Sequence, residues 1–212
     1  MRRAMAFLTP LGGARSARRT PTAGSLAWFP VVGALVGLAV GGVWWLAAQV
    51  WPPGVAAALA VAADLALTGL LHFDGLIDTA DGLLPPMGRE RRLEVMADPA
   101  AGAFGVATAV VVVLLRWAAL AGRSPAVCLV AGIWCASRTT MAVALRSLPY
   151  ARAEGLATAM GGGVPSGAAS VGVLGMALAV GLAAVSAARA GAQAMRQAAA
   201  MVPSVRVCFM VV

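Results

Sequence analysis

The stretch "WFPVVGALVGLAVGGVWWLAAQV", residues 28–50, contains no charged side chain over a length sufficient to cross a lipid bilayer. It is followed by "WPPG" at residues 51–54, where two prolines end a helix. Uncharged apolar runs of this length are typical of membrane-spanning helices rather than of soluble domains. This stretch therefore predicts the first membrane span, and with it the fold class.

The composition of the whole chain supports the same class. Of 212 residues, 61% are hydrophobic and only 11% are charged, about half the charged fraction of an ordinary soluble domain. Further apolar runs predict spans near residues 55–71, 103–121, 126–145 and 168–187. We therefore expect an all-α fold, a polytopic integral membrane helix bundle with about five to six transmembrane helices.

The arginines predict the orientation and the division of the chain. The net charge is +8, but no basic stripe carries interleaved aromatics, which argues against nucleic-acid binding. Arginines precede the first span and occupy the loops after the second and fourth spans, so we expect a multi-pass protein of the cell inner membrane with its site facing the cytoplasm. The expected divisions are a basic cytoplasmic N-terminal segment (1–25), a transmembrane catalytic helix bundle (26–188), and an atypical tail (189–212). The composition of this tail resembles that of a truncated or frame-shifted chain.

Three aspartates lie in the stretch "HFDGLIDTADG", residues 72–82. Asp74, Asp78 and Asp81 are spaced i, i+4, i+7, so on a helix they fall within about 60° of one face. Like charges at this spacing repel each other, and a bound Mg²⁺ or Mn²⁺ that also holds phosphate oxygens would offset the cost. A solvated acidic helix end and the cation or proton site of a transporter are the alternatives.

The residues around the aspartates extend this candidate site. His72 could act as a general base, bind phosphate, or only anchor a helix at the membrane interface. Gly75 and Gly82 lack side chains, so a bulky substrate could approach the backbone closely. Asp64 lies within the second span, about 40° around a continuous helix from Asp78. It could reach the same site or be a buried, protonated structural carboxyl.

Three segments resemble motifs of the cobalamin synthase family. "HFDGLIDTADGL" is similar to the family signature, whose usual form is close to H-x-D-G-L-x-D-x-x-D-G. "EVMADPAAGAFGV", residues 94–106, resembles the family's MxDxxxGxxG segment, and "SLPYARAEGL", residues 147–156, resembles PYAR-x-x-GL. The resemblance runs from about residue 25 to about residue 160, with the motifs in the family's order.

The resemblance implies a reaction and the groups that serve it. It implies an Mg²⁺-dependent transferase that joins adenosylcobinamide-GDP to α-ribazole, or to its 5′-phosphate, with release of GMP. Asp74, Asp78 and Asp81 are then the expected metal ligands, and one of them would also take the proton of the attacking hydroxyl. The expected partners are these substrates, the lipid bilayer and other enzymes of cobalamin biosynthesis, with no nucleic acid.

Further substrate-binding residues are expected outside the aspartate segment. The resemblance covers Asp98, whose alternative role is that of a helix N-cap before Pro99. It also covers Arg152, a candidate phosphate ligand. Arg138 lies within the fourth span, where it could pair with an aspartate, grip a phosphate or extend to the interface.

Other classes of function remain open from the sequence. The family's C-terminal glycine-rich motif, GGxTGDxxGA, is absent, so a catalytically inactive truncated copy is the first alternative. A CDP-alcohol phosphotransferase would require D-G-x-x-A-R, but Asp78 and Thr79 stand at the Ala-Arg places. A cation-coupled transporter would depend on Asp64 rather than on the interfacial aspartates.

Overall fold

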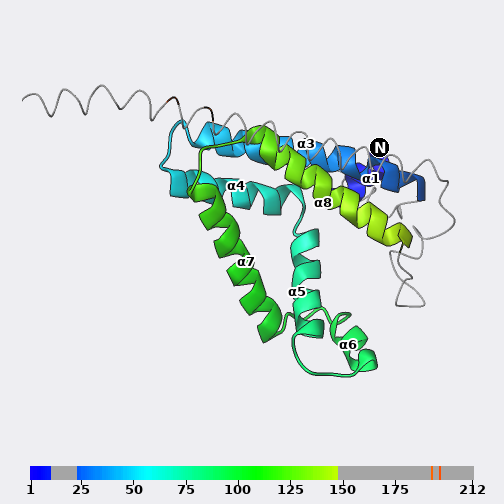
Figure 1. Cartoon of the computed structure of the whole chain (residues 1–212). Coiled ribbons are helices and arrows are strands. Elements are labelled where there is room, and N and C mark those ends of the chain that lie inside the picture. Colours follow the sequence, from blue (N-terminus) through cyan, green and yellow to red (C-terminus); the bar gives the residue numbers. More distant parts are fainter. Residues whose placement is uncertain (11–22, 148–191, 193–195, 197–212) are drawn as a thin grey trace, which may run out of the picture.

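The computed structural model describes residues 1–10, 23–147, 192 and 196, and this part of the chain is helical throughout, without a strand (Figure 1). The helices are α1 (Arg2–Leu8), the 3₁₀ helix η2 (Ala23–Trp28), α3 (Phe29–Ala47), α4 (Pro53–Leu67), α5 (Leu71–Leu83), α6 (Arg89–Val95), α7 (Ala103–Ala121) and α8 (Val127–Ser147). The prediction of an all-α fold is confirmed.

The predicted spans at residues 28–50, 103–121 and 126–145 correspond to α3, α7 and α8, each long and apolar enough to cross a membrane. The bent pair α4–α5 brings the number of candidate spans in the described residues from three to four if it counts as one span. These helices agree with a membrane bundle. The predicted span at residues 168–187 lies outside the described residues.

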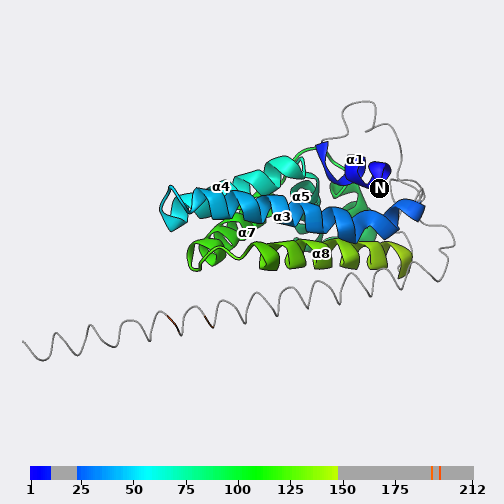
Figure 2. The same ribbon diagram turned by 90° about the horizontal axis from the view of Figure 1, so that it is seen from above.

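Helix α3 lies between α4 and α8 in Figure 2 and packs most extensively against α8. Gly33, Gly37 and Gly41 recur every four residues on the face of α3 that meets α8. A Cβ atom on Gly37 would lie 2.7 Å from the Cα of Ala131, and one on Gly33 would lie 2.6 Å from the backbone oxygen of Trp134. The two backbones approach this closely because glycine has no side chain, as in other membrane helix pairs. We call this contact the α3–α8 seam.

The chain turns by 90° between α4 and α5. Gly69 and Leu70 both have left-handed backbone angles there, with φ of 56° and 62°. Glycine adopts this conformation freely, whereas leucine is strained in it. The expected relation of about 40° between Asp64 and Asp78 does not hold, because it assumed one continuous helix.

The N-terminal helix α1 packs against the start of α3. Ala4 and Leu8 are buried in the hydrophobic core, and the ring of Phe7 stacks on that of Phe29 with centroids 5.9 Å apart. The described part of the predicted N-terminal segment is therefore attached to the helix bundle.

Candidate active site on helix α5

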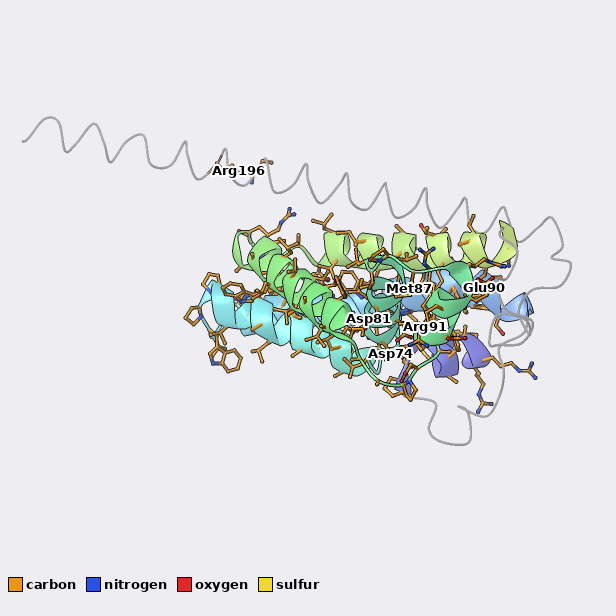
Figure 3. The ribbon with its side chains drawn as sticks, turned by 90° about the horizontal axis from the view of Figure 1, so that it is seen from below. Asp74, Asp81, Met87, Glu90, Arg91 and Arg196 are labelled. Carbon is orange, nitrogen blue, oxygen red and sulfur yellow. The ribbon has the colours of Figure 1, made fainter. Side chains whose placement is uncertain are left out.

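The aspartate segment forms a regular helix, α5, which lies beside α7 and across the direction of α3, α4 and α8 (Figure 1). Asp74 is exposed, Asp78 is partly buried and Asp81 is buried. Figure 3 labels Asp74 and Asp81 on this helix. In the described ranges, no three His, Cys, Asp or Glu side chains lie close enough together to hold a metal ion. The structure thus confirms the predicted helix without gathering its three aspartates into one cluster.

Asp81 is engaged with the start of α7. Its Oδ2 accepts a hydrogen bond of 2.7 Å from the backbone N–H of Gly102, and its Oδ1 accepts one of 2.8 Å from that of Gly105. These are the N-cap and the third residue of α7, whose N–H groups have no partner within the helix. A carboxylate is favoured at a helix N-terminus because the helix dipole is positive there. We call the contact between Asp81, Gly102 and Gly105 the α5–α7 joint.

The α5–α7 joint requires glycine at both positions, because the carboxylate of Asp81 occupies the space that a side chain would need. A Cβ atom on Gly102 or on Gly105 would overlap the carboxylate of Asp81. At Gly105 it would also lie 2.6 Å from Cγ2 of Ile77 and 2.9 Å from that residue's backbone oxygen. Any larger residue would therefore push α7 away from α5.

The two glycines of α5 that were predicted to admit substrate have different surroundings. A Cβ atom on Gly75 would meet nothing within 4 Å, so the surface there is open. A Cβ atom on Gly82 would lie 2.6 Å from Cγ and Cε of Met96, and the carbonyl of Gly82 accepts a 2.8 Å hydrogen bond from Nε of Arg92. Gly82 therefore makes room for the chain that follows α6, and only Gly75 borders open space.

His72 lies on the side of α5 opposite to the aspartates, since its position is about 160° around the helix from that of Asp74. Its Nε2 atom is buried and has no hydrogen-bond partner among the described residues. The charged groups that act on its imidazole are Arg138 of α8 and Asp64 of α4. The structure does not bring His72 together with the aspartates of α5.

Arg138, one of the predicted substrate-binding residues, is buried within α8. Its Nη1 donates a hydrogen bond of 3.2 Å to Oγ of Ser137. Because the side chain is buried, the structure disfavours the predicted role in which Arg138 extends to the membrane interface. Its guanidinium is near enough to His72 for its charge to act on the imidazole.

Asp64 is paired inside the bundle. Its Oδ2 accepts a 2.6 Å hydrogen bond from Nη2 of Arg116, and its Oδ1 accepts one of 2.6 Å from Nε1 of Trp134. The guanidinium of Arg116 also lies 5.3 Å from the ring centroid of Trp134, in a cation–π contact. These three residues, which we call the polar lock, connect α4, α7 and α8. Of the two roles open from the sequence, the geometry favours the buried structural carboxyl.

Sequence reasoning missed Arg116. The signal was present, because a single arginine within the apolar run 103–121 is expensive in a membrane unless it is paired.

Asp98 is exposed, and its Oδ1 accepts a 2.9 Å hydrogen bond from the N–H of Ala100. It is not the N-cap of α7, which is Gly102. A depression of about 450 Å³ is lined by Arg91, Glu94, Val95, Ala97, Asp98 and Pro99. Arg152 lies outside the described residues.

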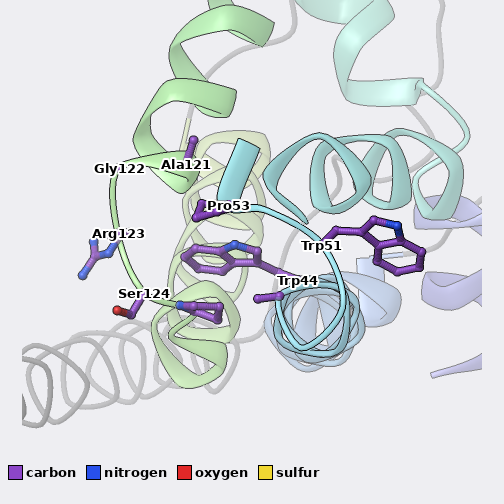
Figure 4. A pocket seen from close by; sticks show the side chains of 9 residues that line it. Trp44, Trp51, Pro53, Ala121, Gly122, Arg123 and Ser124 are labelled. Atoms are coloured by element: carbon purple, nitrogen blue, oxygen red, sulfur yellow. The ribbon is translucent and has the colours of Figure 1, made fainter. Parts of the chain in front are cut away.

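A second pocket, of about 430 Å³, lies where the α3–α4 turn meets the α7–α8 turn (Figure 4). Its lining includes Trp44, Trp51 and Arg123. It is at the far end of α7 from Asp81, and a helix of 19 residues is about 28 Å long. None of the predicted site residues lines this pocket.

Comparison with known proteins decides the family. A family model described as "Cobalamin-5-phosphate synthase" matches residues 1–212. The chain belongs to this family. The resemblance noted in the sequence is thereby confirmed, and neither a CDP-alcohol phosphotransferase nor a cation-coupled transporter is needed to explain the aspartates.

Curated relatives of the family share more than a third of their aligned residues with the chain. The chain is 41% identical over 156 residues to the adenosylcobinamide-GDP ribazoletransferase of Deinococcus radiodurans, covering 72% of the chain and 57% of the relative. It is 45% identical over 130 residues to that of Desulfitobacterium hafniense, covering 57% and 51%. It is 38% identical over 192 residues to that of Bradyrhizobium diazoefficiens, covering 85% and 73%.

The chain thus spans between half and three fifths of the length of the first two of these relatives. No solved structure matches it. In this member of the family, the α5–α7 joint connects two of the motif segments. Asp81 belongs to the segment at residues 72–83, and Gly102 and Gly105 belong to the segment at residues 94–106.

Proposed function

We propose that the chain is an adenosylcobinamide-GDP ribazoletransferase, which joins adenosylcobinamide-GDP to α-ribazole, or to its 5′-phosphate, and releases GMP. Family membership and the names of the relatives support this proposal. The observation that carries it is the placement of Asp74 and Asp78 one helical turn apart on the same face of α5, with open space at the intervening Gly75. Asp74 is exposed, so a phosphate-rich substrate has room to approach this end of the face.

The residues of this face fit an Mg²⁺ site of the kind that forms with a phosphorylated substrate. Mg²⁺ is usually held by one or two carboxylates, several waters and the substrate's own phosphate oxygens. Asp74 and Asp78 supply two carboxylates from one helix, so the absence of a three-ligand cluster in the described residues does not conflict with this arrangement. The metal, when bound, would neutralise the charge of the pyrophosphate.

The reaction requires one proton acceptor from the protein. The α-ribazole hydroxyl forms a bond to the phosphorus attached to cobinamide, the P–O bond to GMP breaks, and the hydroxyl proton must be accepted. We assign this role to an aspartate of α5, because the predicted alternative, His72, lies on the opposite side of the helix.

The remaining site residues and the setting stay proposals. Asp98 in the described residues, and Arg152 outside them, are proposed to contact substrate. Arg138 is buried near His72 rather than beside Asp74, so its predicted contact with substrate stays a prediction. Asp98 borders a depression that Arg91 also lines. The arginine distribution supports a site on the cytoplasmic side of the inner membrane. Association with other cobalamin-biosynthesis enzymes remains a prediction.

The test uses the full 212-residue chain in lipid nanodiscs, incubated with adenosylcobinamide-GDP and α-ribazole. Mass spectrometry should detect the cobalamin product and GMP, both only in the presence of Mg²⁺. We expect Asp78→Asn to lower kcat/KM by about 100-fold or more, as is typical when a group that stabilises transition-state charge is lost.

The control is Glu90→Gln, which removes an exposed carboxylate of α6 and should leave the rate within about twofold. Full activity of Asp78→Asn, or product formation after chelation of Mg²⁺, would contradict the proposed function.

A further inference from the structure

The carboxylate of Asp81 has surroundings unlike those of Asp74. Both of its oxygens accept backbone hydrogen bonds, and the side chain is buried under the start of α7. Asp74, by contrast, is exposed and adjoins Gly75, where a Cβ atom would meet nothing within 4 Å. The three aspartates share a helix face, and the carboxylate of Asp81 is the one held by the backbone at the start of α7.

The surroundings of Asp81 do not suit the binding of a cation, but they suit the capping of a helix N-terminus. Mg²⁺ requires near-octahedral ligands at about 2.0–2.1 Å and keeps several waters, for which a carboxylate covered by backbone has little room. The N-terminus of α7 already carries a partial positive charge, which stabilises an aspartate and repels a metal ion. The side chain therefore has its counter-charge from α7 itself.

Gly82, the residue after Asp81, contacts a second part of the chain, α6 and the residue that follows it. The carbonyl of Gly82 accepts a hydrogen bond from Arg92 of α6, and Met96 covers the glycine's Cα. Both the segment after α5 and the start of α7 are thus held at the last turn of α5. Asp98, whose hydrogen bond to Ala100 forms the turn before α7, lies between these two attachments.

We propose that Asp81 is a positioning residue, which holds the start of α7 and the Asp98 turn against α5, and that it is not a metal ligand. The last aspartate of the α5 segment shapes the site, and the first two serve the metal. The metal part of this inference rests on the proposed function; the role of the joint does not.

The first experiment compares Asp81→Asn with Asp78→Asn in the full chain, with Mn²⁺ as the probe for the metal and hydrogen exchange of residues 100–110 as the probe for the joint. Asp81→Asn should speed exchange by about 10-fold or more, because a backbone donor loses its charged partner, and leave Mn²⁺ affinity within about twofold. Asp78→Asn should weaken Mn²⁺ binding by about 10-fold or more and leave exchange unchanged.

The opposite pattern, in which Asp81→Asn weakens Mn²⁺ binding and leaves exchange unchanged, would overturn the inference. If Asp81→Asn does not fold, Gly102→Ala provides the same test, since the nearest atoms to its Cβ all belong to the carboxyl group of Asp81, which it displaces without removing. It should speed exchange and preserve Mn²⁺ affinity. Failure of the unmodified chain to bind Mn²⁺ would contradict the proposed function, and the exchange of residues 100–110 would still decide the role of the joint.

A second experiment separates positioning from simple capping. Asp81→Ala removes the carboxylate and frees space at Gly102, so adding Gly102→Ser supplies α7 with a local N-cap that has no connection to α5. Exchange protection of residues 100–110 should recover at least halfway, whereas kcat per folded molecule should stay at least about 10-fold below that of the unmodified chain. Recovery of kcat along with protection would show that α7 needs only a cap, and would overturn the positioning role.

Discussion

Two helix contacts in this protein depend on glycine, and they differ in what occupies the space that glycine leaves. At the α3–α8 seam, Gly37 admits the backbone of α8 around Ala131, so two helices approach along their length. At the α5–α7 joint, Gly102 and Gly105 admit the carboxylate of Asp81, so one side chain meets a helix end. The first contact is apolar and supports the fold, and the second is polar and adjoins the candidate active site.

The difference shows that a close glycine contact has no single meaning in a membrane helix bundle. At the glycines of the seam, the contact is van der Waals packing of helix against helix, which lipid can partly replace. At the joint, hydrogen-bond donors would be left without a partner if the carboxylate moved away. Substitutions at the seam should therefore change stability, whereas substitutions at the joint should change the geometry of the site.

The largest effect on stability is expected at neither glycine contact but at the polar lock. Asp64→Leu leaves the charge of Arg116 without its carboxylate. Loss of one partner of a buried pair costs about 3–5 kcal/mol, and we expect the lower part of this range because the side chain of Arg116 is 28% exposed. SDS titration of the purified chain should report this loss in the free energy of unfolding.

The control for the polar lock is the double variant Asp64→Leu/Arg116→Leu, which should recover most of the loss because an apolar pair can replace a buried ion pair. A double variant no more stable than Asp64→Leu would show that the lock does not act as an ion pair.

Gly37→Leu should break the seam. The new side chain would begin 2.7 Å from a backbone atom of α8, so the helices must separate, at a cost of about 3 kcal/mol in the free energy of unfolding. Gly42→Leu is the matched control on the same helix, since a Cβ atom there meets nothing within 4 Å. Equal stability of the two variants would contradict the seam as described.

The smallest effect is expected at the bend between α4 and α5. Gly69→Ala places a Cβ atom on a left-handed residue, which costs about 1–2 kcal/mol. Gly54→Ala, where the nearest atom to the new Cβ is at an ordinary 3.6 Å, should change stability by less than about 0.5 kcal/mol. Thermal unfolding in detergent measures both, and a neutral Gly69→Ala would show that the bend is not held in this conformation.

Much of the fold followed from local properties of the sequence. The uncharged run at residues 28–50 predicted α3, and the spacing of Asp74, Asp78 and Asp81 predicted one face of a helix that the structure contains. Hydropathy and the helical periodicity of side chains are sufficient for such predictions, because a helix and its faces depend on residues close together in the sequence. The seam also had a local signal, the four-residue spacing of Gly33, Gly37 and Gly41, which the prediction of spans did not use.

The sequence by itself thus determined a membrane bundle of apolar helices, an aspartate-bearing helix and membership of the cobalamin-5-phosphate synthase family. Only the tertiary structure decided what each carboxylate meets. Asp81 meets donors 21 and 24 residues away, and Asp64 meets partners 52 and 70 residues away. The 90° bend after α4 is what separates these two environments. No spacing rule within one helix can anticipate them, because the partner of a polar group is set by which other helix packs against it.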